Sequence, residues 1–118
     1  MTNVQIFGLK NSQATRAADR FFKERGVTIH FVDLSKKLMA PGEIRRFIDR
    51  FGLRELVDRE GKSYVDAGLG YFKLSDSELI AKIEGDPKLL RLPLVRAGDR
   101  LSVGRDEHGW KEMLQPGK

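Results

Sequence analysis

The chain has 118 residues, contains no cysteine, and has no apolar run of membrane-spanning length. Without cysteine it forms no disulfide, holds no metal through thiolates and has no thiol nucleophile. A membrane-spanning helix needs roughly 20 apolar residues, and the N-terminus lacks the basic-then-apolar pattern of a signal peptide. The sequence therefore predicts a single domain, residues 1–118, that is cytoplasmic and has no membrane partner.

Histidine is also scarce, and neither sign of charge forms a block. His30 and His108 are isolated and have no cysteine partners, so we expect no metal site. Lys and Arg number 22 against 17 Asp and Glu, which gives a net charge of +5. This balance favours an anionic ligand or an acidic partner surface. Basic and acidic residues are interleaved without aromatic–basic alternation, a pattern that does not favour nucleic acid as a partner.

The N-terminal part of the chain shows a strand–helix–strand pattern. Residues 4–7 are predicted to form a short strand, and residues 13–25 a helix that ends at a left-handed Gly26. Residues 27–32 alternate as a second strand, which completes a βαβ unit. The loop at residues 8–12 leads into the helix N-terminus, where free N–H groups and the helix dipole favour an anion.

The middle of the chain, residues 41–90, is predicted to be a helical insertion. A helix starts at Pro41 and ends at Gly52, because proline suits the first turn and glycine the end. Ser75 and Glu78 have the spacing of a capping box and should start another helix, which runs to about residue 84. Shorter helical pieces are expected at residues 53–57, 64–69 and 88–90.

The C-terminal part is predicted to be a β-hairpin followed by a helix. The strands are residues 92–96 and 100–103, joined by a turn at residues 97–99. The last helix carries Trp110 and Met113 on its apolar face. The whole order predicts an α/β fold with a mixed β-sheet: a βαβ unit, a helical insertion, a β-hairpin and a C-terminal helix.

Four segments carry a resemblance to a known family: residues 6–12 (IFGLKNS), 64–69 (YVDAGL), 89–95 (LLRLPLV) and 100–104 (RLSVG). With these segments and their spacing, the chain resembles the ArsC/Spx family. That family comprises glutathione- or glutaredoxin-linked arsenate reductases, related reductases and the Spx transcription regulators. The resemblance implies a thioredoxin-like fold in which Pro93 is a cis-proline facing the catalytic loop.

The resemblance also assigns site residues. Ser12 matches the family's nucleophilic cysteine, and Thr15 matches a hydroxyl residue of the reductases or the second cysteine of Spx. The residues expected to bind substrate or anion are Asn11, Thr15, Arg16, Arg91, Pro93 and Arg105. No bound cofactor is implied; glutathione or another small thiol would be a co-substrate, and glutaredoxin or another protein a partner.

The chain departs from the family pattern at two arginine positions. Leu92 stands where the family has an arginine before the proline, although Arg91 is one residue earlier. The family's mid-chain arginine corresponds to a position near residues 58–60, where this chain has an acidic residue instead. Only Arg105 of the three family arginines is kept. Each charge-assisted bond contributes roughly 1.5–3 kcal/mol, so arsenate binding should be weak.

Ser12 itself allows three interpretations. It can be a helix N-cap, which serine favours and which needs no chemistry. It can be a genuine loss of the nucleophile, or a replacement for a native cysteine or selenocysteine. A serine nucleophile is not favoured, because neither His30 nor His108 lies in a segment that matches the active site.

Two classes of function follow. The first is an arsenate reductase-like, thiol-dependent oxidoreductase scaffold, inactive with Ser12 at the nucleophile's position. The second is a non-catalytic or regulatory thioredoxin-like module that resembles Spx and contacts a partner around Gly52. In the simplest structural interpretation, Thr15 is only a tolerated polar residue and Arg16 only a solvated charge.

Overall fold

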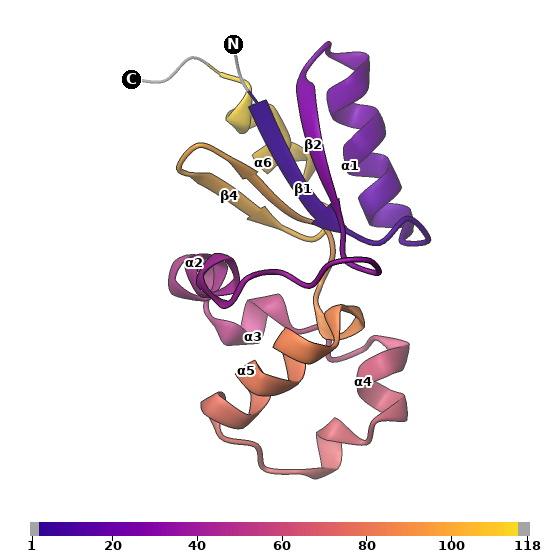
Figure 1. Ribbon diagram of the computed structural model, residues 1–118, viewed down its shortest axis with the longest axis vertical. Coiled ribbons are helices and arrows are strands. Elements are labelled where there is room, and N and C mark those ends of the chain that lie inside the picture. The colour runs from indigo at the N-terminus through magenta and orange to yellow at the C-terminus, as the bar shows by residue number, and fades with distance from the viewer. Residues whose placement is uncertain (1–2, 116–118) are drawn as a thin grey trace. The chain divides into compact units, whose positions relative to one another are not determined.

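The structure is a computed structural model that describes residues 3–115, and it divides into two compact units (Figure 1). One unit combines the two ends of the chain, up to residue 37 and from residue 92 onward, and holds the β-sheet. The other is the helical segment of residues 38–91, close to the predicted insertion at 41–90. We describe each unit separately and call them the sheet unit and the helical unit.

The sheet unit contains a four-stranded mixed sheet, as predicted, in the order β2-β1-β3-β4. Strand β1 pairs in parallel with β2, whereas β1 with β3 and β3 with β4 are antiparallel. The elements of this unit are β1 (Asn3–Gly8), α1 (Gln13–Glu24), β2 (Thr28–Asp33), β3 (Leu94–Ala97), β4 (Arg100–Val103) and α6 (Glu107–Met113).

One face of this sheet forms the core of the unit. Val4 and Ile6 of β1 are fully buried, and they pack in one cluster with Phe22 of α1 and Trp110 of α6. The rings of Phe22 and Trp110 lie 6.1 Å apart between centroids, within the usual range of aromatic contact. This core fixes α1 and α6 against the same face, and α1 in turn positions the loop between β1 and α1.

Helix α1 ends one residue earlier than predicted, and its end explains the start of β2. Gly26 has a positive φ of 69°, and its N–H donates to the Lys23 carbonyl while that of Val27 donates to the Phe22 carbonyl. These two bonds form a Schellman motif. Because Val27 is used to close the helix, the strand begins at Thr28 rather than at residue 27.

The hairpin is tighter than predicted. Ala97 was expected in the turn, but it belongs to β3 and pairs with Arg100. The loop is therefore only Gly98 and Asp99, and Gly98 supplies the positive φ, 63°, that two-residue hairpins require. At the other end β3 starts at Leu94 and not at residue 92, because Pro93 has no N–H to donate to a ladder.

The helical unit consists of helices and 3₁₀ turns, together with one isolated antiparallel β-bridge between Val57 and Leu90. Its elements are α2 (Pro41–Phe51), α3 (Leu53–Leu56), α4 (Lys62–Asp66), η1 (Leu69–Tyr71), α5 (Asp76–Gly85) and η2 (Pro87–Leu89). The capping box of Ser75 and Glu78 starts α5 as predicted. The helical piece expected at residues 64–69 is instead split into α4 and η1, because Gly68 adopts a left-handed conformation with φ 69°.

Buried apolar residues of the helical unit include Ile44, Phe47, Leu56 and Ile83, each at most 1% exposed. None of the helices within residues 3–115 has the length and apolar character needed to cross a membrane.

Candidate functional site

The loop between β1 and α1 is the candidate site, and Ser12 is its central residue. Ser12 is the N-cap of α1, and its Oγ accepts a hydrogen bond of 3.2 Å from the Thr15 backbone N–H. The Ser12 N–H donates to the Leu9 carbonyl at 3.0 Å, which closes the loop in front of the helix. The structure thus confirms the N-cap interpretation, and it places the Ser12 hydroxyl at the positive end of the helix dipole.

Arg16 braces the same loop. Its Nη1 donates to the Lys10 carbonyl at 3.0 Å, although the residue is exposed. The expectation that Arg16 is only a solvated charge is therefore incomplete, because the guanidinium ties the first turn of α1 back to the loop. Its positive charge stays near the helix N-terminus, where it favours a bound anion.

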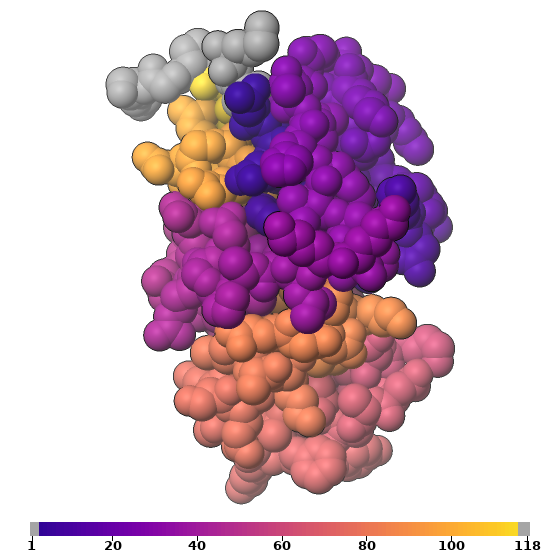
Figure 2. Space-filling model, in the orientation of Figure 1, coloured from indigo at the N-terminus to yellow at the C-terminus, as the bar shows by residue number. Residues whose placement is uncertain are grey.

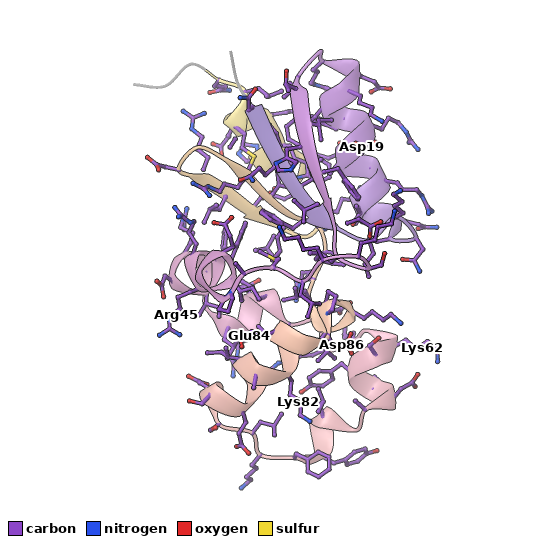
Figure 3. All side chains as sticks on the ribbon, in the orientation of Figure 1. Asp19, Arg45, Lys62, Lys82, Glu84 and Asp86 are labelled. Carbon is purple, nitrogen blue, oxygen red and sulfur yellow. The ribbon has the colours of Figure 1, made fainter. Side chains whose placement is uncertain are left out.

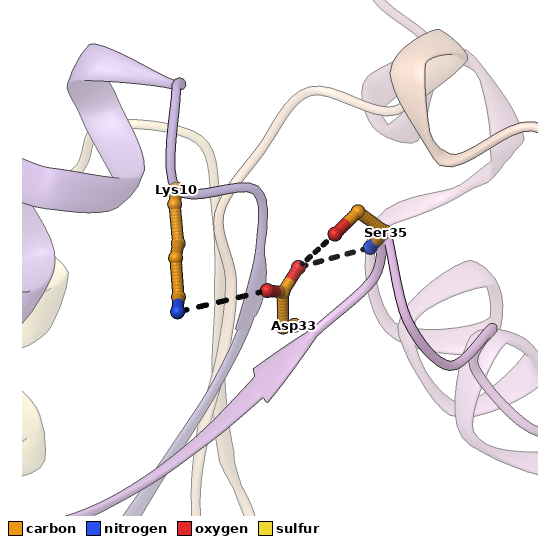
Figure 4. Close-up of polar contacts among 3 residues, drawn as sticks. All are labelled: Lys10, Asp33 and Ser35. Carbon is orange, nitrogen blue, oxygen red and sulfur yellow. Dashed lines mark hydrogen bonds and ion pairs between the residues drawn. The ribbon is translucent and has the colours of Figure 1, made fainter.

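Lys10 and Asp33 join the loop to the end of β2 (Figure 4). The Lys10 Nζ lies 4.0 Å from the Asp33 Oδ2, while the Ser35 Oγ and N–H both donate to Oδ1, at 2.7 and 3.0 Å. The two Ser35 hydrogen bonds, with a smaller contribution from Lys10, lower the pKa of Asp33 below its ordinary value. Asp33 is therefore ionised at neutral pH and partly offsets the positive charge of the loop.

Lys10, Asp33 and Ser35 are not among the site residues predicted from the sequence. A signal was available for Asp33, because it follows a predicted strand that runs parallel to β1. The carboxyl ends of parallel strands meet at the same edge of a sheet, and Asp33 is in fact in register with Gly8. No comparable local signal marks Lys10.

Thr15 is a buried residue of the first turn of α1. Only 1% of its surface is exposed, and its Oγ1 has no hydrogen-bond partner among the described residues. The side chain lies directly against Gly8, where an added Cβ would be 2.5 Å from both Oγ1 and Cγ2 of Thr15. Glycine at position 8 thus leaves the space that the Thr15 side chain fills.

A cleft of about 340 Å³ lies beside this loop. It is lined by Lys10, Thr15, Arg16, Asp19, Lys23 and Phe31. Asp19 lies on α1 (Figure 3), where its carboxylate is paired with Lys23 at 2.9 Å. The lining thus includes one aromatic ring, three basic side chains and one carboxylate, which suits a small anionic molecule that has an apolar part.

The remaining predicted site residues lie outside this loop. Pro93 is buried before β3, its peptide bond to Leu92 is cis, and its carbonyl accepts from the Gly104 N–H at 2.9 Å. Arg105 is exposed and forms an ion pair of 3.3 Å with Glu107. Arg91 is part of the helical unit, where its backbone N–H donates to the Leu56 carbonyl.

The structure therefore brings together Asn11, Ser12, Thr15 and Arg16, which follow one another closely in the loop and first turn of α1. Within residues 3–115 no group of three or more His, Asp or Glu side chains could hold a metal ion. The chemistry that the loop offers is hydrogen bonding and positive potential around one hydroxyl oxygen.

The fold and this loop define the class of protein, a thioredoxin-like α/β protein with a strand–loop–helix site. Comparison with known proteins gives the particular family. The chain belongs to the ArsC family, whose model matches residues 7–113. This match includes the β1–α1 loop and nearly all of both units.

Individual relatives agree with this assignment. The chain is 24% identical over 113 residues to the global transcriptional regulator Spx 2 of Oceanobacillus iheyensis, covering 94% of this chain and 83% of the regulator. The arsenate reductase from Vibrio cholerae has a similar structure, with a TM-score of 0.82 and 22% identity over 96% of this chain and 98% of that chain. An arsenate reductase (ArsC) related protein from Brucella melitensis gives a TM-score of 0.68 at 19% identity, over 93% of this chain and 92% of that one. The fold is therefore that of the arsenate reductase-like proteins.

Proposed function

We propose that the chain is an arsenate reductase-like, thiol-dependent oxidoreductase scaffold that has no redox turnover with serine at position 12. The observation that supports this proposal is the role of Ser12, whose Oγ caps α1. By the resemblance, this position would carry the nucleophilic sulfur. A thiolate at this position would be stabilised by the helix dipole and by Arg16. An alcohol at the same position is neutral at physiological pH and needs a general base to attack.

Neither histidine supplies such a base. His108 lies on α6, where its Nε2 is 3.6 Å from the Glu112 carboxylate. His30 lies within β2 and is in register with Gln5, away from the loop that follows β1. In a form with a thiol or selenol at position 12, a small thiol such as glutathione would resolve the intermediate, since the chain has no second cysteine. We also propose that glutaredoxin would be the protein partner of this form and that the chain is cytoplasmic.

The substitution Ser12→Cys tests whether the loop is a thiolate site. We expect an apparent pKa below about 8.5, the value of a free cysteine, because the sulfur lies at a helix N-terminus. The measurement is the pH dependence of alkylation by iodoacetamide. Ala81→Cys, at an exposed position inside α5, is the matched control and should titrate like free cysteine. Equal pKa values in the two variants would refute the thiolate site.

Arsenate reduction is the second test. The chain with Ser12 should give no turnover of arsenate with glutathione and glutaredoxin, because it lacks sulfur to form the covalent intermediate and keeps only Arg105 of the three family arginines. The rate should equal that of a control without enzyme. Turnover above that control would show that the serine form is active. The natural gene adds independent information, since a cysteine or selenocysteine codon at position 12 favours the enzyme.

A non-catalytic, regulatory module is the alternative, and the similarity to the regulator Spx 2 favours it. The partner would bind the helical unit around Gly52, where α2 meets α3 and Arg50 and Arg54 are exposed. Two results together would favour this alternative over the enzyme. The first is a serine codon at position 12. The second is partner binding that weakens in Arg54→Gln and stays unchanged in Ser12→Ala.

A further inference from the structure

Strand β2 forms one edge of the four-stranded sheet (Figure 1). All six of its residues, Thr28–Asp33, are at least partly exposed, whereas most of β1 is buried. Figure 2 shows atoms of this part of the chain, in purple, at the surface. An edge strand carries a row of N–H and C=O groups that point away from the sheet and have no strand partner.

The β2 edge lacks the features that usually protect an edge from pairing. Residues 28–33 include no lysine, arginine, proline or glycine. The register with β1 is continuous from Asn3 to Gly8, so β2 has no bulge that would twist the edge away. Among the described residues, no loop, turn or cap forms a backbone hydrogen bond with residues 28–32. The outward main-chain groups of β2 are therefore open to a further strand.

The opposite edge of the sheet, β4, is protected in two ways. It has only four residues, and it begins with Arg100, whose guanidinium donates to the Gln115 carbonyl at 3.0 Å. Short edge strands and charged side chains on an edge both oppose pairing with another chain. Of the two edges, β2 is thus the one suited to a partner strand.

The cleft of about 340 Å³ beside the Ser12 loop adjoins this edge. Its lining comes from the β1–α1 loop, from α1 and from Phe31 of β2. Phe31 is half-buried and packs against the core between the sheet and α1. A strand paired with β2 would direct every second side chain to this same face. The cleft therefore forms a pocket for alternate side chains of an added strand, which is how strand-addition sites achieve specificity.

The charges around the cleft favour an acidic segment. Lys10 and Lys23 are exposed, and the Arg16 guanidinium bonds a carbonyl rather than a carboxylate. Asp33 and the carboxylate paired with Lys23 offset only part of this charge. The whole net charge of +5 belongs to the sheet unit, because residues 38–91 contain equal numbers of basic and acidic residues. The field of this unit thus attracts acidic partners.

A second copy of the chain fits the β2 edge less well than an acidic segment does. The β2 strand of a second copy would bring Asp33 as its only carboxylate. That carboxylate already accepts two hydrogen bonds from Ser35. A segment with several carboxylates complements the basic cleft better.

We infer that β2 is a docking edge for an extended acidic segment of a partner protein, which adds to the sheet as a further strand. Main-chain hydrogen bonds to β2 supply affinity, and alternate side chains enter the cleft, with carboxylates on either side of an apolar group beside Phe31. The inference requires no thiol at position 12. It therefore stands or fails separately from the proposed function.

The probe is the blocked peptide acetyl-Thr-Glu-Thr-Val-Thr-Glu-Thr-amide, titrated into the full ¹⁵N-labelled chain and followed by NMR at low salt. We expect saturable shifts in β2 and slower hydrogen exchange at alternate amides within residues 28–33, because the peptide covers them. The same peptide with lysine in place of both glutamates should bind at least about tenfold more weakly, since its charges repel the cleft.

Backbone N-methylation tests strand pairing directly. Alternate N–H groups of a strand point to opposite sides, and only one side of the peptide can face β2. We compare a peptide methylated at the glutamates and valine with one methylated at the inner threonines. One of the two should bind at least about tenfold more weakly than the parent peptide, because it loses several main-chain bonds, and the other should bind nearly as the parent does.

Lys23→Gln should weaken binding of the acidic peptide about threefold, as expected for an exposed ion pair. Lys111→Gln is the matched control, because it removes the same charge from an exposed position on α6. Each of four outcomes overturns the inference: no saturable binding, equal effects of the two methylation patterns, equal weakening in both variants, or a dimer in sedimentation whose β2 amides are already protected. The ¹⁵N spectrum of each variant verifies its fold.

Discussion

At the scale of single residues, the packing of Thr15 against Gly8 shapes the β1–α1 loop. The Thr15 backbone N–H is bonded to Ser12 while its side chain fills the space over Gly8. The two residues therefore connect the helix cap to the end of β1. A change at either one alters the position of residue 12, which the proposed chemistry depends on.

Gly8→Ala should destabilise the chain by about 1–3 kcal/mol, the usual cost of overpacking a close contact. The physical reason is that the new methyl group would lie 2.5 Å from two Thr15 side-chain atoms. Urea unfolding followed by the fluorescence of Trp110, which is fully buried in the sheet unit, measures the change.

The double variant Gly8→Ala with Thr15→Ala should recover most of this loss relative to Thr15→Ala alone, because the clashing atoms are gone. Gly85→Ala is the matched control, since a Cβ there meets nothing within 4 Å. Equal losses for Gly8→Ala with and without Thr15 would show that the contact is not the cause.

At the scale of elements, capping explains where the helices begin. Ser12 caps α1, and Ser75 caps α5 by accepting from the Glu78 N–H at 3.1 Å. The Glu78 carboxylate completes the capping box by accepting from the Ser75 N–H at 2.9 Å. This backbone bond, and secondly the bond to the Ser75 side chain, lowers the pKa of Glu78 from its ordinary 4.5.

The sign of the resulting pH dependence is fixed. Because folding lowers the pKa of Glu78, its contribution to the free energy of unfolding is fully present above pH 4.5 and disappears as pH falls through the folded-state pKa. We therefore expect Glu78→Gln to be less stable than the unchanged chain at pH 7, with a difference that shrinks as the pH falls below about 4.5.

Urea unfolding from pH 7 down to pH 3.5 measures this difference. Glu84→Gln removes the same charge from the last turn of α5, away from the capping box, and serves as the control. If the stability difference between Glu78→Gln and the unchanged chain does not vary with pH, the carboxylate bond does not stabilise the helix.

At the scale of the whole molecule, the chain is organised as two compact units. In the sheet unit Ile6 and Trp110 belong to one buried cluster, and in the helical unit Phe47 and Ile83 are buried. Whether they unfold together, as expected of a single domain over residues 1–118, stays a prediction. Proteins often open in contiguous parts before they unfold globally.

Ile83→Ala should destabilise the helical unit by about 2–5 kcal/mol, because it leaves a cavity around a residue that is only 1% exposed. Native-state hydrogen exchange should show faster exchange in α3 and α5, with a much smaller change in β1 and α1. Ile6→Ala in the sheet unit should give the reverse pattern. A uniform change in both units would show that they open only together.

Much of the fold could be predicted from the sequence, because its signals are local. The capping box at Ser75, the helix end at Gly26 and the cap at Ser12 each involve residues within a few positions of one another. The α/β class and mixed sheet followed from the order of these elements. Boundaries were less accurate where a glycine conformation decided them, as at Gly68 and Gly98.

The candidate site could be predicted only in part. Ser12 and Arg16 follow from the strand–loop–helix pattern and from the family resemblance. The burial of Thr15 could not be predicted, because it depends on how closely α1 approaches the end of β1. The role of Asp33 likewise depends on the parallel register that places it opposite Gly8.

The sequence by itself thus determined the secondary structure, the capped loop and the lack of sulfur at position 12. These depend on residue type and on short-range hydrogen bonds. Only the tertiary structure decided which distant residues meet: Lys10 with Asp33, Thr15 with Gly8, and Phe31 with the residues of α1 that line the cleft. Strand pairing and core packing create these contacts, and neither is recorded in the local pattern of a single strand or helix.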